Sequence, residues 1–293
     1  MHQRLNFIGC GQLGKTLGHL WQHSHTICIG DVLTRANASA QSAVGMMGAG
    51  RAITAIDDMQ AAEIYLIACG DDAIEDCSKQ LASSGLLRQG DVVFHCSGAQ
   101  PSTLLQACKE QGALTASIHP IKSFAQLSLA IESFAGTYCG TEGDQGALDI
   151  LHPLFATIGA NLLPIQTAHK TLYHAASVIA SNYLVTLQEI SLLTFEKAGI
   201  NRETATAILQ PIVTGTVENI FHLGTSAALT GPIARGDSEV VSAQLTAMQD
   251  WNEDFAATYK ILGKLSLPIA AEKGTADMAD LALLHRLLDE PPQ

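Results

Sequence analysis

Positive charge is scarce in this chain of 293 residues. Lys and Arg total 16 against 28 Asp and Glu, which gives a formal net charge of −12. The basic residues form no run or stripe, whereas a protein that binds nucleic acid needs a cluster of them to meet the phosphates. We therefore expect no nucleic-acid partner, although helix N-termini and a few local cations can still hold a compact anion.

Long apolar runs and paired cysteines are also missing. We find no run of 18 or more apolar residues, and the opening MHQRLNFIG enters a candidate strand without the apolar stretch of a signal peptide. The seven cysteines form no C-x-x-C pair, and several lie within apolar segments. We therefore expect a cytoplasmic protein with reduced thiols, no membrane partner and no metal site.

Apolar residues make up 47% of the chain and follow two different patterns along it. In the first half, short apolar segments alternate with helical ones. Strands are expected near residues 5–9, 25–33, 63–70, 91–98 and 113–120, with two more on either side of a helix at 143–158. Such alternation predicts an α/β fold with a Rossmann-type, doubly wound, mostly parallel sheet.

Beyond Ile165 the strand pattern stops. Helices are expected at residues 169–198, 202–223, 237–262 and 276–288. Pro211 should kink or divide the second of these, and Gly199 should end the first. The sequence therefore predicts two domains, residues 1–165 with the sheet and residues 166–293 with helices alone.

The sequence GCGQLG at residues 9–14 is a G-x-G-x-x-G that follows the first expected strand and opens a helix. In this context the pattern predicts a dinucleotide-binding turn. Gly9 would permit the tight turn, Gly11 would let backbone approach a pyrophosphate, and Gly14 would let the helix pack closely on the strand. The candidate cofactor contacts here are Gly9, Cys10, Gly11, Gln12, Leu13 and Gly14. A purely structural glycine-rich turn is the alternative.

The end of the second strand distinguishes NAD from NADP. The residue that contacts the ribose should lie about 20 positions past the last glycine. Thr34 and Arg35 fall there, and a hydroxyl followed by Arg suits a 2′-phosphate, so NADP is expected rather than NAD. The alternative is that Asp31 binds the ribose of NAD. At the ends of later strands, further cofactor contacts are expected from Cys69, Gly70, Ser97 and Gly98.

Five strings stand in order along the chain: GCGQLG, HCSGA, SIHPIKSF, YHAASVIASNYL and ALTGPIARGD. With them the chain resembles an uncharacterised bacterial family that has an N-terminal Rossmann-like oxidoreductase domain and a C-terminal helical domain of unknown function. That family is similar to pyrroline-5-carboxylate reductase, 3-hydroxyacid dehydrogenases and 6-phosphogluconate dehydrogenase. The resemblance implies a helical domain that dimerises and completes the active-site cleft. The Lys–Asn pair of the 3-hydroxyacid dehydrogenases is not kept, since Lys170 is followed four residues later by His174.

The helix at 169–198 carries polar groups in an otherwise apolar sequence. At about 100° per residue, Lys170, His174, Ser177 and Ser181 share one face, with Asn182 beside it. The segment is apolar enough to be buried nearly all round, and buried polar groups need hydrogen-bond partners. The stripe therefore lines either a cleft or a domain or dimer interface.

Together these features predict an NADP-dependent oxidoreductase that reduces a carbonyl or imine of a small, carboxylate-bearing substrate in an interdomain cleft. The expected catalytic residues are His174, Asn182, Ser181 and His119; the alternative for His119 is that the His-Pro pair only fixes a turn. Lys170 and Arg235 are expected to bind the substrate anion. By resemblance, the C-terminal helices should form a homodimer. A sensor or assembly protein that binds NADP without turnover is the alternative function.

Overall fold

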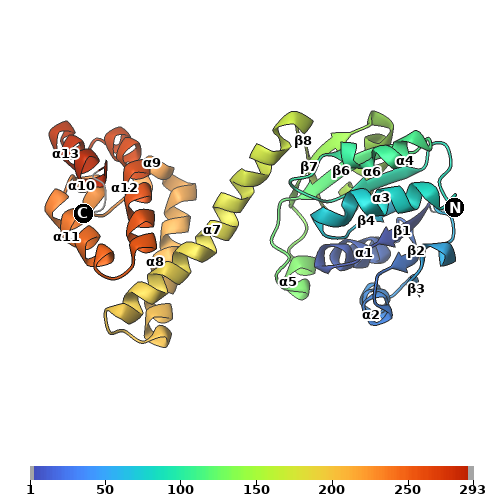
Figure 1. Ribbon diagram of the computed structural model, residues 1–293, viewed down its shortest axis with the longest axis horizontal. Helices are drawn as coiled ribbons and strands as arrows, with labels where there is room; N and C mark the ends of the chain where they lie inside the picture. Colours follow the sequence, from blue (N-terminus) through green and yellow to red (C-terminus); the bar gives the residue numbers. More distant parts are fainter. Residues whose placement is uncertain (1–2, 290–293) are drawn as a thin grey trace. The chain divides into compact units, whose positions relative to one another are not determined.

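The computed structural model describes residues 3–289, which form two compact units, one ending at Tyr183 and the other beginning at Leu184. The first unit is built around a β-sheet and the second contains helices (Figure 1). The last strand ends at Pro164, close to the predicted change from strands to helices. The first unit also includes the first half of the long helix that follows.

An eight-stranded sheet in the order β3-β2-β1-β4-β5-β6-β7-β8 organises the first unit. All neighbouring strands are parallel except β6 and β7, which confirms the predicted Rossmann-type, mostly parallel sheet. The strands are β1 (Arg4–Ile8), β2 (Cys28–Leu33), β3 (Arg51–Ile53), β4 (Ile64–Ile67), β5 (Val92–His95), β6 (Leu114–Pro120), β7 (Tyr138–Gly143) and β8 (Asn161–Pro164). The sequence does not predict β3, because three residues at a sheet edge carry no periodic signal.

Helices cover both faces of the sheet, because successive side chains of its strands point to opposite sides. In β4, Ile64 and Leu66 belong to one apolar core, and Tyr65 and Ile67 belong to the other. The first core includes residues of α1 (Gln12–Ser24), α2 (Asn37–Met47) and α6 (Gln145–Ala156), with α5 (Leu127–Glu132) against α1. The second includes residues of α3 (Ile74–Ser83) and α4 (Gln106–Glu110). Short 3-10 helices lie at Ile56–Asp58, Asp71–Ala73, Ser102–Leu105 and Thr167–His169.

The second unit has a small apolar core formed by three of its helices, α11, α12 and α13. The helices from the long linking one onward are α7 (Lys170–Lys197), α8 (Arg202–Leu223), α9 (Thr225–Ala228), α10 (Pro232–Arg235), α11 (Ser238–Gln249), α12 (Glu253–Lys273) and α13 (Met278–Asp289). The helix α8 continues through Pro211, so of the two expected effects of this proline the division does not occur. One expectation was wrong. The single helix expected at 237–262 is two helices, because Asn252 caps α12 by accepting a hydrogen bond from the N–H of Phe255 at 3.0 Å.

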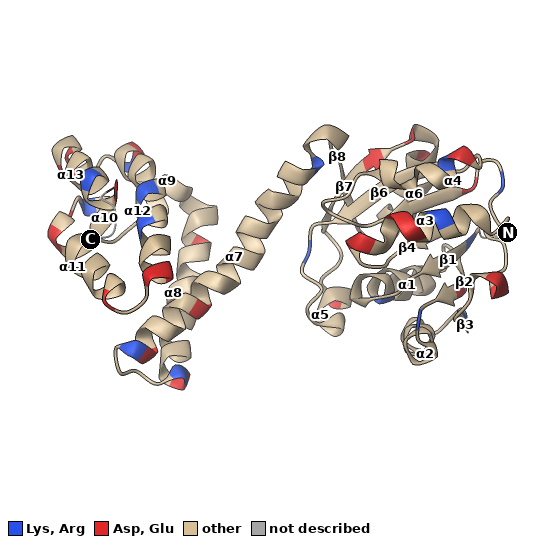
Figure 2. Cartoon of the chain, viewed as in Figure 1, with Lys and Arg blue, Asp and Glu red and all other residues tan. Residues whose placement is uncertain are grey.

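The long helix α7 is much more exposed in the single chain than its composition predicts. Lys170 is buried, but Leu172 and Val185 expose 74% and 70% of their surface. Within the described part of the chain, Thr167–Lys197 is one helix with the length and mean hydropathy, 1.2, of a membrane span. One such helix is weak evidence of a membrane, since helices of soluble proteins pass the same test. Lys and Arg are scattered among Asp and Glu in each unit (Figure 2).

A buried ion pair anchors the beginning of α7 to the sheet. Lys170 Nζ lies 3.0 Å from Glu142 Oε1 on β7, and it also donates a hydrogen bond to Ser117 Oγ on β6. Glu142 accepts three more hydrogen bonds, from the N–H and hydroxyl of Ser102 at 2.8 and 2.7 Å and from the Thr167 hydroxyl at 3.1 Å. Every oxygen of this carboxylate is therefore satisfied, as a buried charge requires.

The pKa values of the pair follow from this arrangement. Burial alone would raise the pKa of Glu142, but hydrogen bonds from Ser102 and the charge of Lys170 outweigh it and lower the pKa. Burial lowers the pKa of Lys170, and the carboxylate of Glu142 opposes that shift. The ammonium is thus stabilised by its partner and shielded from water, so the expected direct contact of Lys170 with a dissolved substrate does not fit its position.

Removing one partner of this pair should destabilise the first unit strongly. Lys170→Met leaves the buried Glu142 carboxylate without its ion-pair partner, and Glu142→Gln leaves the buried ammonium of Lys170 without its own. Each variant should lower the free energy of unfolding by about 3–5 kcal/mol. The double variant leaves no buried charge and should recover most of that loss. Denaturant titration measures all three. Lys109→Met, at the more exposed ion pair of Lys109 with Asp144, is the matched control and should cost about 1 kcal/mol or less. A double variant no more stable than either single one would contradict the assignment.

Candidate active site

The turn between β1 and α1 has the geometry that a dinucleotide requires. Gly9 has φ of +78°, and a β-carbon there would lie 2.7 Å from the backbone nitrogen of Cys69. A β-carbon on Gly11 would meet no atom within 4 Å, so this position is open to a ligand. A β-carbon on Gly14 would lie 3.1 Å from Cys10 Sγ and 3.4 Å from Ala68 Cβ, which reflects close packing of the helix on the sheet.

The first turn of α1 also offers an anion site. This helix begins after Gly11, and no described side chain caps its N-terminus. Its first amide groups are therefore available to a phosphate, and the helix dipole favours negative charge there. Gln12 is exposed and Leu13 half-buried at this edge. Burial raises the pKa of the Cys10 thiol to about 12, so Cys10 remains protonated. These residues fit the pyrophosphate of a dinucleotide.

Asp31, the alternative ribose contact, is fully buried and already bound. Its two oxygens accept hydrogen bonds from Arg51 at 2.8 and 3.1 Å, and the N–H of Gln60 adds one at 2.6 Å. Arg4 completes an ion pair at 3.3 Å. Burial would raise the pKa of Asp31, but the bonds from Arg51 and Gln60 outweigh it and lower the pKa. Asp31 therefore stabilises the sheet edge.

Thr34 and Arg35 follow directly after β2, which ends at Leu33. Arg35 is exposed at this position, and the Thr34 hydroxyl donates to the carbonyl of Ala36 at 2.7 Å. A cation here matches the expected place for a ribose 2′-phosphate.

The loops after β4 and β5 contain the other expected cofactor contacts. Cys69 and Gly70 follow β4. Ser97 follows β5, and its hydroxyl accepts hydrogen bonds from the N–H groups of Ala99 and Gln100 at 3.2 and 3.0 Å. Ser97 therefore shapes its own turn. Both loops lie at the carboxyl ends of the strands, where ligands bind in open α/β sheets.

Two imidazole rings meet at Gly98. A β-carbon on Gly98 would lie 2.3 Å from His174 Nδ1 and 2.7 Å from His119 Nε2, so only glycine leaves room for both. The two ring centroids are 5.5 Å apart in an edge-to-face arrangement. His119 comes from β6 and His174 from α7, and the structure thus brings together two of the predicted catalytic residues.

Tyr173 fixes the orientation of His119. Its hydroxyl lies 2.9 Å from His119 Nδ1 and is also hydrogen bonded to the backbone of Gly140. With the Gly140 N–H donating to the hydroxyl, the hydroxyl can donate to Nδ1, an arrangement that places the proton of His119 on Nε2, beside Gly98. Within residues 3–289, the buried His174 Nδ1 has no hydrogen-bond partner. A polar atom left in this state is available for a ligand.

His119 and His95 are held neutral at this edge of the sheet. Burial, followed by the effects of His174 and Lys170, lowers the pKa of His119 to about 4. Burial and the charge of Lys170 lower the pKa of His95 to about 4 as well. His95 Nδ1 accepts from the Ser97 N–H at 3.1 Å, and its Nε2 lies 3.1 Å from the Pro101 carbonyl, which fits the neutral ring. At neutral pH the His119 imidazole is therefore an uncharged N–H donor.

Of the remaining predicted residues, two lie further along α7 and one belongs to the second unit. Ser181 and Asn182 are exposed two turns further along α7, about 10 Å beyond His174 along the helix axis. Arg235 belongs to the second unit, at the end of α10, and lies 3.7 Å from Asp237 Oδ2. Sequence reasoning missed Tyr173 and Glu142. Glu142 lies between an expected strand and the helix expected at 143–158, so the sequence gives little sign of it; its burial in β7 beside Lys170 reveals its role.

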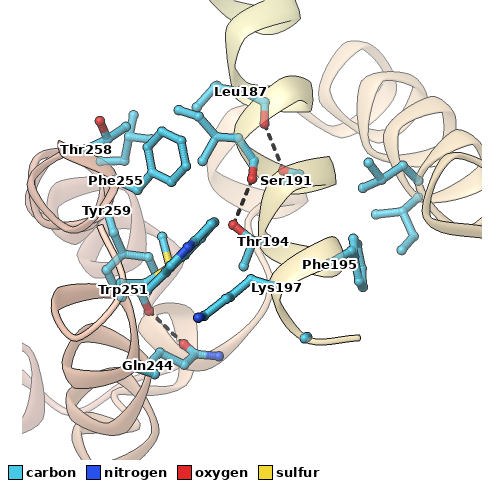
Figure 3. A pocket seen from close by; sticks show the side chains of 17 residues that line it. Leu187, Ser191, Thr194, Phe195, Lys197, Gln244, Trp251, Phe255, Thr258 and Tyr259 are labelled. Carbon is cyan, nitrogen blue, oxygen red and sulfur yellow. Dashed lines mark hydrogen bonds between the residues drawn. The ribbon is translucent and has the colours of Figure 1, made fainter. Parts of the chain in front are cut away.

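A separate apolar cavity of about 860 Å³ lies within the second unit, between α7, α8, α11 and α12 (Figure 3). Trp251, Phe255 and Tyr259 line one side and Leu187 and Phe195 line another. None of the predicted catalytic or substrate-binding residues lines it. Among the described residues, no group of three His, Cys, Asp or Glu side chains is placed to hold a metal ion.

Comparison with solved structures shows how widely this architecture is shared. A Thermotoga maritima protein, TM1727, is 27% identical, with 92% of this chain and 99% of that chain covered at a TM-score of 0.71. A Bacteroides fragilis protein assigned as an NADP oxidoreductase is 17% identical, covering 90% and 97% at 0.74. The NADP-bound pyrroline carboxylate reductase of Plasmodium falciparum is 14% identical, covering 93% and 97% at 0.56. At such low identities the last two matches show a common fold.

Family models account for most of the sequence. A Rossmann-like domain matches residues 2–120, and a domain of unknown function, DUF2520, matches residues 137–266. No curated protein sequence gives a significant match. The resemblance noted from the sequence motifs is confirmed: the chain consists of a Rossmann-like domain followed by a domain of the DUF2520 family.

Proposed function

We propose that the chain uses NADPH to reduce the carbonyl or imine group of a small, carboxylate-bearing substrate. The proposal rests on the positions of two features of the first unit. The open glycine turn at the start of α1 and the imidazoles against Gly98 lie at the same carboxyl edge of one parallel sheet. A dinucleotide bound across that edge would extend from an anion site towards the two imidazole rings.

The residues have distinct roles in this reaction. When bound, reduced nicotinamide would supply a hydride to the substrate carbon. The Nε2–H of His119 hydrogen bonds to the carbonyl oxygen or imine nitrogen, and His174 transfers the proton that this atom needs. Tyr173 keeps the His119 proton on Nε2, and the Lys170–Glu142 pair positions the helix that carries Tyr173 and His174.

NADP is proposed over NAD because Arg35 is exposed where a 2′-phosphate would lie, while Asp31 is occupied by Arg51. The pyrroline carboxylate reductase with NADP bound supports the same choice of cofactor and an imine with a carboxylate. A cleft between the domains, a substrate carboxylate held by Arg235, and roles for Ser181 and Asn182 remain predictions. Seven free cysteines accord with a cytoplasmic location.

A homodimer formed through the helical unit is also proposed. Apolar side chains on its helices are open to solvent in the single chain, including Val185 on α7, Phe221 on α8 and Leu265 on α12. Phe221 alone exposes 84% of its surface. Apolar surface spread over three helices is typical of a protein interface, and a second copy of the chain would cover it.

Arg35→Ala should abolish the preference for NADPH over NADH. Losing a charge-assisted contact with the 2′-phosphate should weaken NADPH binding by roughly tenfold or more and leave NADH binding unchanged. Fluorescence titration with both nucleotides measures this. Gly11→Ala is the matched control: its β-carbon fits the fold but occupies the open space at the turn, so both nucleotides should bind more weakly. An unchanged preference in Arg35→Ala would exclude the 2′-phosphate role.

His174→Ala should lower kcat by roughly 10²–10⁴-fold with little change in NADPH affinity, because a proton donor is lost. NADPH oxidation with a panel of keto acids and cyclic imines provides the assay. His119→Gln keeps a neutral N–H donor and should retain more activity than His119→Ala. His169→Ala, an exposed histidine just before α7, is the control and should behave as wild type. NADPH binding with no turnover on any substrate would instead support a sensor.

Sedimentation velocity should give a particle of twice the chain mass of 30.9 kDa. Phe221→Glu places a charge on the proposed interface, where burial is costly, and should shift the equilibrium to monomer. Thr246→Glu adds the same charge at an exposed polar position on α11 of the same unit and serves as a control for charge alone. A monomeric wild type at micromolar concentration would rule out the dimer.

A further inference from the structure

Two histidine rings lie against each other on α1, one helical turn apart. His19 and His23 have ring centroids 4.0 Å apart and an interplanar angle of 32°. Residues four apart share one face of a helix, and this is a spacing at which two imidazoles can bind the same metal ion. His19 is half-buried and His23 is exposed, so both rings can be reached from water. Neither has a role in the proposed reduction.

Backbone carbonyls decide which nitrogen of each ring carries the proton. His19 Nδ1 lies 3.0 Å from the carbonyl oxygen of Met46, and His23 Nδ1 lies 2.8 Å from that of His19. A carbonyl oxygen can only accept a hydrogen bond, so both Nδ1 atoms are protonated and donate. In the neutral rings, Nε2 is then the nitrogen with a free lone pair. Metal-binding histidines are oriented in the same way, with the other ring N–H donated to a carbonyl or carboxylate.

The ends of two helices make this position suitable for a positive charge. His23 lies in the last turn of α1, which ends at Ser24. Met46, whose carbonyl accepts from His19, lies in the last turn of α2. Carbonyl groups at a helix C-terminus carry partial negative charge and stabilise a cation beside them. A metal ion on the two imidazoles would therefore lie next to two such helix ends.

We propose that His19 and His23 form a binding site for a divalent transition-metal ion such as Zn²⁺ or Ni²⁺. Each Nε2 would bind the ion through its lone pair, at about 2.0–2.1 Å for zinc. The terminal torsion of a histidine side chain varies broadly, so a small rotation of the exposed His23 ring would bring both nitrogens onto one ion. Water would complete the coordination. Imidazole ligands select these ions over Mg²⁺ and Ca²⁺, which bind oxygen.

This site is separate from the proposed nucleotide site. At about 1.5 Å per residue, His19 lies about 12 Å beyond Gly11 along the axis of α1. The ion would join the last two turns of α1 and, through the Met46 carbonyl, hold them against the end of α2. Because the folded helix brings the two rings together, binding should stabilise the first unit. The proposal differs from the sequence-based expectation of no metal site, since two ligands give an open surface site.

Isothermal titration calorimetry of the full chain with Ni²⁺ tests the site without reference to any cofactor. His19→Ala and His23→Ala should each weaken binding by roughly tenfold or more, because one of two ligands is lost. His222→Ala is the matched control. His222 Nδ1 also lies 2.8 Å from the carbonyl oxygen of Glu218, four residues earlier, but within the described residues its ring contacts no second ring. Cys28→Ser removes the exposed thiol and should also bind as wild type.

Thermal unfolding provides a second measurement. Ni²⁺ at about ten times its Kd should raise the Tm of the wild type and leave that of the double variant His19→Ala/His23→Ala unchanged. No binding of Ni²⁺ to the wild type, or wild-type affinity in both single variants, would overturn the proposal. An equal loss of affinity in His222→Ala or Cys28→Ser would place the ion on another group and would overturn it as well.

Discussion

The ion pair of Lys170 with Glu142 sets the position of everything that α7 contributes to the sheet edge. Its cost in desolvation is offset by four hydrogen bonds to the carboxylate. Because Tyr173 and His174 lie within the next turn of the same helix, they are held against His119 by this one contact. The pair also supplies a positive charge that helps keep the nearby imidazoles neutral. The Lys170–Glu142 pair therefore both positions the side chains at this edge and helps to keep the nearby imidazoles uncharged.

The glycine turn and the sheet were predictable because their signals are local. Gly9, Gly11 and Gly14 follow a strand and open a helix, and each has the environment that its position in the motif implies. The helix boundaries were less predictable where caps compete with apolar periodicity. Asn252 lies between α11 and α12. Apolar residues continue at helical spacing on both sides of it, so the sequence pattern does not show where one helix ends and the next begins.

The polar face of α7 was predictable only in part. Periodicity places Lys170, His174, Ser177 and Ser181 on one stripe, but it does not say how far along the helix contact with the sheet extends. Contact is made in the first turns, so Ser181 is exposed while Lys170 is buried. Tyr173 lies beside this stripe, about 60° from Lys170 and about 40° from Ser177, and it reaches His119. That contact is made with residues of β6 and β7, so it cannot be predicted from the sequence of the helix alone.

Gly98 has a consequence for how the sequence can vary. It contributes no side chain to chemistry, and its backbone does not need the left-handed conformation. Only glycine fits at position 98 because nitrogens of two neighbouring imidazole rings occupy the space that a β-carbon would take. Substitution of Gly98 by a larger residue would first require His119 or His174 to be replaced. Once a histidine has been replaced, position 98 can acquire a side chain. Restoring the two imidazole rings would then require glycine to return at position 98 at the same time.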